Sequence, residues 1–254
     1  MTSHFRLSWI PTFVLAAITL ACGGGQNQAP TGTTAPVANP VDPATAGSVS
    51  GRITFEGTPP PATPISMKSD PNCQPGSAAA SESIVVGSNG GLQNVFVYVK
   101  DGLGNLKFPV PATAVVINQQ GCRYAPHVLG IQVGQPLEVL NNDETLHNVH
   151  AVAKTNREFN AGQPLKGIKN TFTFTAKEVM VPFRCDVHNW MNAWVGVLDH
   201  PFFSVTGTDG TFELKGLPPG TYTVEAWHEK LGTQTQTVTV GEKAIATAAF
   251  TFKS

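Results

Sequence analysis

The feature that most constrains the fold of this chain is an alternation of apolar and polar residues that starts near residue 47. The first run places Val49, Ile53 and Phe55 on one face. Similar runs cover residues 95–99, 222–226 and 238–240. Side chains of a strand point alternately to its two faces, so each run buries one face against a core. Many short runs separated by Gly- and Pro-rich turns predict an all-β fold built from β-sandwiches.

Length and charge narrow the class of protein further. A chain of 254 residues with 41% hydrophobic residues can bury one large core or two small ones without help from a metal. Its formal net charge is only −1, and no basic run stands out. Binding to nucleic acid relies on many Lys and Arg contacts to phosphates, so we expect no nucleic-acid partner.

The first 22 residues read as an export signal. Arg6 supplies a positive start, and residues 9–20 form an apolar stretch that is too short for a permanent membrane span. The segment from Ile18 to Cys22 resembles a bacterial lipobox, although Thr19 stands where Leu is usual. The resemblance implies lipidation of Cys22 and a membrane anchor, and the alternative is an ordinary signal peptide. We expect an exported protein, in the periplasm or on the outer surface of a bacterium.

Residues 23–46 follow as a predicted disordered linker. They contain one charged residue, Asp42, and almost no large apolar groups. Such a segment cannot bury enough surface to offset the entropy of ordering.

The C-terminal segment resembles the carboxypeptidase regulatory-like sandwich, which is also described as transthyretin-like or carbohydrate-binding-like. Residues 205–232 carry its Asp-Gly turn, an alternating strand and a Leu-Pro-Pro-Gly-x-Tyr corner. That family usually opens with a G-x-V-x-G-x-I strand, and here this pattern lies at residues 47–53. We therefore expect a split sandwich made of 47–111 and 200–254, with 112–199 inserted. The simpler alternative is three units in a row.

Residues 112–199 resemble the cupredoxin family, most closely amicyanin and plastocyanin. The resemblance rests on Tyr124-Ala125-Pro126, on Asn141-Asn142 followed by Leu146-His147-Asn148-Val149-His150, and on the loop Cys185-x-x-His188-x-x-Met191. It implies a second, Greek-key sandwich. It also implies that His147, Cys185, His188 and Met191 bind one copper ion. A soft thiolate, two imidazoles and a weak thioether suit both Cu(I) and Cu(II).

Two histidines compete for the upstream position. Residues three apart on a strand point to opposite faces, so His147 and His150 cannot easily reach one ion. We choose His147 on its match to the family, and His150 remains the alternative ligand. Asn148 then matches the family's neighbouring asparagine, whose hydrogen bonds steady the two ligand segments. The loop itself is expected to follow an alternating strand from Thr171 to Phe183.

Two further cysteines are left if Cys185 binds metal. Export to an oxidising compartment permits a disulfide between Cys73 and Cys122, and the alternative is two free buried thiols. The resemblance also places the loop histidine, His188, at the edge through which electrons pass. Trp190 and Trp194 would then help to form a docking surface, unless they pack in the core. His127, His200 and His228 are expected to have structural or surface roles.

The expected function is electron transfer by Cu(II)/Cu(I) cycling, without substrate chemistry. Suitable partners are periplasmic redox proteins such as c-type cytochromes or a dehydrogenase. A multicopper oxidase would need an extra run of His-Cys-His in the sequence for a trinuclear cluster, and a dinuclear centre would need a second cysteine in the loop; neither surrounds Cys185. The remaining alternatives are a copper enzyme, copper delivery or storage, and a glycan- or protein-binding module that uses Tyr222 or Trp227.

Overall fold

The computed structural model describes residues 1–2, 37–73 and 79–253. The predicted export signal, including Cys22, and most of the predicted linker lie outside these residues. The described part consists of strands, connecting loops and the 3-10 turn η1 (Pro71–Cys73). It contains no helix that is long and apolar enough to cross a membrane.

Seven strands form the first sandwich. Its two sheets have the orders β13-β1-β16 and β12-β2-β14-β15. The strands are β1 (Gly47–Glu56), β2 (Phe96–Asp101), β12 (Phe203–Val205), β13 (Thr211–Leu217), β14 (Gly220–His228), β15 (Gly232–Val240) and β16 (Ile245–Lys253). The alternation of β1 buries Val49, Ile53 and Phe55 in the core between the sheets.

Strand β1 holds this sandwich together across the sequence, because it pairs antiparallel with β13 and parallel with β16. A Cβ at Gly51 would lie 1.7 Å from the carbonyl oxygen of Ala248, so only glycine allows the two backbones to approach this closely. Near the start of β14, the hydroxyl of the buried Tyr222 donates a hydrogen bond to the carbonyl oxygen of Pro218 at 2.6 Å. This contact fixes the corner after Leu217.

The second sandwich contains the remaining nine strands. Its sheets have the orders β5-β11-β10-β7-β8 and β4-β3-β6-β9. The strands are β3 (Val115–Gln119), β4 (Tyr124–Ala125), β5 (Val128–Gln132), β6 (Pro136–Asn141), β7 (His147–Ala151), β8 (Phe159–Gln163), β9 (Lys169–Thr173), β10 (Glu178–Arg184) and β11 (Asn192–Leu198). The predicted all-β fold with two sandwiches is confirmed.

The prediction of one strand from Thr171 to Phe183 is wrong. The structure forms two strands there, since β9 pairs with β6 in one sheet and β10 pairs with β11 and β7 in the other. The buried Phe174 follows β9, where the chain crosses between the sheets. An apolar residue at such a crossing continues the alternation, so the pattern alone does not show the break.

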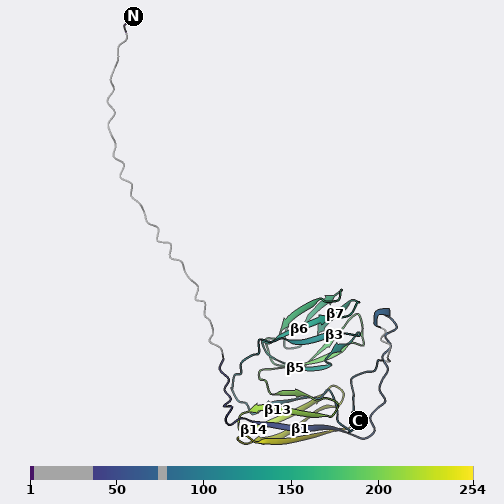
Figure 1. Cartoon of the computed structure of the whole chain (residues 1–254), viewed down its shortest axis with the longest axis vertical. Coiled ribbons are helices and arrows are strands. Elements are labelled where there is room, and N and C mark those ends of the chain that lie inside the picture. The colour runs from purple at the N-terminus through teal and green to yellow at the C-terminus, as the bar shows by residue number, and fades with distance from the viewer. Residues whose placement is uncertain (3–36, 74–78, 254) are drawn as a thin grey trace. The chain divides into compact units, whose positions relative to one another are not determined.

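Two features connect the sandwiches. A shared apolar cluster contains Phe96 and Tyr98 of β2 together with Val128 and Leu198 of β5 and β11. The segment between β1 and β2 leaves the first sandwich and runs beside the second, where η1 lies (blue in Figure 1). This segment brings residues from outside 112–199 next to the loop between β10 and β11.

Candidate metal centre

Three donor atoms come together inside the second sandwich. His147 begins β7, whereas Cys185 and His188 lie in the loop between β10 and β11. The end of β10 pairs antiparallel with the end of β7, so the loop after Arg184 continues along β7 toward His147. The donor atoms of the three side chains lie within 4.8 Å of one another.

The donors face a small and deeply buried space. Nδ1 of His147 lies 2.9 Å from Nδ1 of His188, and Sγ of Cys185 lies 3.9 Å from the same His188 nitrogen. The exposed fractions are 0% for His147, 2% for Cys185 and 2% for His188. Three neighbouring donors of the types that bind transition metals are therefore shielded from water.

Carboxylates hold the outer nitrogens of both imidazoles. Nε2 of His147 lies 2.9 Å from Oδ2 of Asp143, and Nε2 of His188 lies 3.0 Å from Oδ2 of Asp70. Histidines that bind metals commonly give their second ring N–H to a carboxylate, which fixes the tautomer and the ring orientation. The two Nδ1 atoms are thus left to face Cys185.

The electrostatics of the three donors favour a positive charge between them. Burial acts to lower the pKa of His147, but Asp143 and Cys185 raise it to about 9. Burial acts to raise the pKa of Cys185, yet the hydrogen bond with His147 and backbone N–H groups lower it below its usual value. The pKa of His188 is lowered, chiefly by burial. Both shifts favour a proton on His147 over one on Cys185, and a metal cation would take the place of that proton.

Asn148 connects β7 to the loop. Its Oδ1 accepts hydrogen bonds from the backbone N–H groups of Asp186 at 2.7 Å and Val187 at 3.3 Å, and it lies 3.3 Å from Sγ of Cys185. The hydroxyl of Tyr124 donates to the carbonyl oxygen of Asn148. The loop is thereby fixed to β7 independently of any metal.

Met191 closes the loop. Its backbone N–H donates to the carbonyl oxygen of His188 at 2.9 Å, and its carbonyl oxygen accepts from the N–H of Cys185 at 3.1 Å. Met191 is 2% exposed and belongs to the same apolar cluster as Cys185. A buried thioether in the same loop as Cys185 and His188 has the chemistry of a weak fourth ligand.

His150 does not join the three donors. Its Nδ1 lies 2.9 Å from Asp186, and its Nε2 lies 2.7 Å from Glu158. The two histidines of β7 therefore reach different surroundings, and His147 is the one beside Cys185 and His188.

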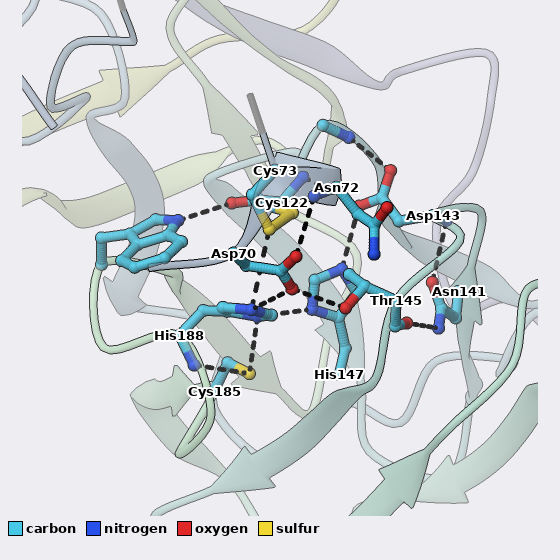
Figure 2. The surroundings of a disulfide bond; sticks show 12 residues. Asp70, Asn72, Cys73, Cys122, Asn141, Asp143, Thr145, His147, Cys185 and His188 are labelled. Carbon is cyan, nitrogen blue, oxygen red and sulfur yellow. Dashed lines mark hydrogen bonds and ion pairs between the residues drawn. A yellow bond between two sulfur atoms is a disulfide. The ribbon is translucent and has the colours of Figure 1, made fainter. Parts of the chain in front are cut away.

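A disulfide joins Cys73 to Cys122, with a Cα–Cα distance of 5.4 Å. Cys185 is the free cysteine among the described residues. Figure 2 shows the disulfide and the carboxylate of Asp70 on one side of the His188 ring and Cys185 on the other.

The outer edge of the His188 ring is covered by other residues. Its Nε2 lies 3.6 Å from Sγ of Cys73, and the segment that carries Asp70 covers it. The half-buried Trp190 lies beside His188 with ring centroids 5.0 Å apart, and its Nε1 donates to the carbonyl oxygen of Cys122. Trp194 packs on Trp227, at 5.1 Å, in the cluster between the sandwiches.

Sequence reasoning did not find Asp70 or Asp143. Asp143 lies four residues before His147, in the turn after β6, and this local spacing is the one signal that points to it. Asp70 lies 118 residues before His188, so no periodicity or motif links the two. The disulfide at Cys73, the hydrogen bond from Thr145 and the packing of Met67 in the second core bring Asp70 near the centre.

The fold and the three donors define a class: an all-β protein of two sandwiches with a buried His-Cys-His cluster. A thiolate and two imidazoles in a buried, preorganised arrangement fit copper, which accepts soft and borderline ligands in both redox states. Two carboxylates on the outer nitrogens agree with such a role.

Residues 193–253 match the family model of the carboxypeptidase regulatory-like domain. The match begins within β11, which pairs with β5 and β10 of the second sandwich. The match does not include β1, which lies between β13 and β16 in the first sandwich. No curated protein matches the chain.

Several solved structures show a weak likeness. The copper-containing nitrite reductase from Thermus scotoductus SA-01 is 19% identical with a TM-score of 0.33, over 40% of this chain and 26% of that one. An oxidised amicyanin mutant is 23% identical with a TM-score of 0.30, over 33% of this chain and 80% of that one. A Cu(I) amicyanin mutant is 24% identical with a TM-score of 0.30, over 40% and 97%. The all-β fold rests on the strand pairings, not on these likenesses.

Proposed function

We propose that this protein binds one copper ion through His147, Cys185 and His188, with Met191 as a weak fourth ligand, and carries electrons. The observation that carries the proposal is the approach of two Nδ1 atoms to a buried thiol of lowered pKa. Bound copper would supply the Cu(II)/Cu(I) couple.

The residues around the donors are suited to electron transfer because they keep the ligands in place. Asn148 holds the loop through three contacts, and Asp70 and Asp143 hold the imidazoles. A ligand set that is fixed before the metal binds needs little rearrangement when the charge of the metal changes. The protein's contribution is this rigidity together with exclusion of water.

Burial favours an electron carrier over a copper enzyme. An enzyme needs a position at the metal that substrate can reach. Here the three donors are at most 2% exposed. Electrons can cross a layer of side chains, whereas a substrate cannot.

Trp190, half-buried and in contact with His188, is our proposed surface contact for a redox partner such as a c-type cytochrome or a dehydrogenase.

The binding-module alternative receives less support. Tyr222, one of its two proposed contact residues, is 2% exposed and uses its hydroxyl within its own corner. Trp227 packs against Trp194. The Tyr222 ring is therefore not presented for a glycan to stack on, and Trp227 is only partly exposed.

We also propose that the cupredoxin-like stretch 112–199 is inserted into a sandwich made of 47–111 and 200–254. Strand β1 from the first part pairs with β13 and β16 of the last part, which supports this division over three sequential units. Export and lipid attachment at Cys22 remain proposals that rest on the sequence. Mass spectrometry of the membrane fraction would test the lipid.

The test of the copper proposal is an optical titration of the purified chain with Cu(II), followed by ascorbate. We expect an intense band at about 600 nm that saturates at one copper per chain, bleaches on reduction and returns on oxidation. Cys185→Ser should abolish the band. His147→Ala should lower the copper stoichiometry, whereas the matched variant His150→Ala should not. A blue Cys185→Ser protein would overturn the assignment.

A further inference from the structure

The outer edge of His188 is closed by residues from a distant part of the chain. Its Nε2 lies 3.0 Å from Oδ2 of Asp70 and 3.6 Å from Sγ of Cys73, while its Nδ1 faces Cys185 and His147. Both ring nitrogens are therefore engaged, and 2% of the residue is exposed.

Asp70 is held firmly in this position. Its Oδ2 accepts a hydrogen bond from the Thr145 hydroxyl at 2.6 Å, and its Oδ1 accepts one from the Asn72 backbone N–H at 2.8 Å. Its carbonyl oxygen accepts a hydrogen bond from the N–H of Cys73 at 3.0 Å. The carboxylate cannot rotate away from His188 without breaking its hydrogen bonds with Thr145 and Asn72.

The disulfide connects the supports of both histidines. Cys73 carries the segment of Asp70, and its partner Cys122 donates its backbone N–H to Oδ2 of Asp143 at 2.8 Å. Asp143 in turn contacts Nε2 of His147. The disulfide thus joins the segment that carries Asp70 to the residue that holds Asp143, and these two carboxylates hold the two imidazoles, as Figure 2 shows.

We propose that Asp70 is a positioning residue of the metal centre. Kept in place by the Cys73–Cys122 disulfide, its carboxylate fixes the His188 ring through Nε2 and closes this edge to exchange of the metal with solvent. The part about the metal rests on the proposed function, but the fixing of His188 does not, because the contact is made by Nε2, the ring nitrogen that faces away from Cys185.

Two consequences follow for the loaded protein. A carboxylate at Nε2–H makes Nδ1 a better donor, which favours Cu(II) over Cu(I). A covered edge also slows the departure of the metal, because His188 must separate from Asp70 and Cys73 before it can turn outward.

The experiment compares four forms of the full chain after loading with copper: wild type, Asp70→Asn, the double variant Cys73→Ser/Cys122→Ser, and Glu144→Gln. Glu144 is the matched control, because its exposed carboxylate pairs with Lys166 and removal of its charge leaves both histidines untouched. Release of Cu(I) to an excess of a bathocuproine chelator gives the dissociation rate, and voltammetry gives the potential.

We expect about tenfold faster release from Asp70→Asn and from the double variant, in line with the effects of losing an outer partner of a ligand. Asp70→Asn should also lower the preference for Cu(II) about tenfold, which raises the potential by about 59 mV. Glu144→Gln should match wild type in both. Equal rates and potentials in all four forms would overturn the proposal.

Nitrogen-15 NMR of the metal-free chain separates this proposal from the copper assignment. A His188 Nε2–H signal that exchanges slowly in wild type and is lost in Asp70→Ala supports positioning by Asp70, even if the chain binds no copper. A signal that persists unchanged in Asp70→Ala refutes it, even if the wild-type protein is blue.

Discussion

Nε2 of His127 lies 2.5 Å from Oε1 of Glu229, although the two residues belong to different sandwiches. His127 precedes β5, Glu229 follows β14, and their side chains are 4% and 7% exposed. Nδ1 of His127 lies 3.2 Å from the carbonyl oxygen of Asn192, at the start of β11. The pair therefore fixes the strand that follows the candidate metal loop to the other sandwich.

Glu229→Ala should destabilise the protein by about 3 kcal/mol, because it leaves a buried histidine without its partner. Urea unfolding, followed by tryptophan fluorescence, measures the change in free energy of unfolding. The control is Glu213→Ala, which removes a carboxylate from an exposed pair with Lys215 and should cost less than about 0.5 kcal/mol. Equal losses of unfolding free energy in the two variants would show that the buried pair contributes no more to stability than the exposed pair.

Acid should destabilise the protein between pH 6.5 and 4. Burial lowers the pKa of both His200 and His228 to about 4, from an ordinary value of 6.5. The unfolded chain binds these protons first, so the stability is complete above pH 6.5 and is lost as pH falls toward 4. Each histidine contributes on the order of 3 kcal/mol.

His228→Asn tests this origin of the acid sensitivity. Nδ1 of His228 accepts hydrogen bonds from the backbone N–H groups of Lys230 and Leu231, and an asparagine oxygen can accept them too. The variant should therefore lose less stability than wild type between pH 7 and pH 4.5, as measured by urea unfolding at both values. Parallel losses in the two proteins would count against the role of His228.

Met191→Leu should retain the Cu–thiolate band and raise the reduction potential. The thioether is the weakest of the proposed ligands, and axial ligands tune the potential without supplying the colour. Because leucine is similar in volume, packing in the cluster around Cys185 should change little. Optical spectra and voltammetry of the two proteins give the comparison, and loss of the band would place Met191 among the essential ligands.

Tyr222→Phe should cost about 1 kcal/mol through loss of the hydrogen bond to Pro218. The ring would remain buried, so the change isolates the hydroxyl. Thermal unfolding measures the effect, and Thr221→Val is a suitable neighbour for comparison because its hydroxyl bonds to Thr239 at the exposed surface. An unchanged midpoint for Tyr222→Phe would mean that the corner does not depend on this contact.

The sequence alone was sufficient for features that are encoded locally. The alternation in β1 and the Pro-Pro-Gly corner before Tyr222 predict strands and a turn, because period-two burial and restricted backbone angles act over a few residues. The loop from Cys185 to Met191 is local in the same sense, since its backbone bonds join residues three to six apart.

Only the tertiary structure decided what surrounds that loop. Asp70 reaches His188 through a segment that a disulfide anchors, and no spacing in the sequence encodes a contact across 118 residues. The break between β9 and β10 was also hidden, because the crossing keeps an alternating pattern while the pairing partners change. Local patterns specify strands and short loops, whereas the closed edge of the candidate centre depends on how the two sandwiches and their connecting segment pack.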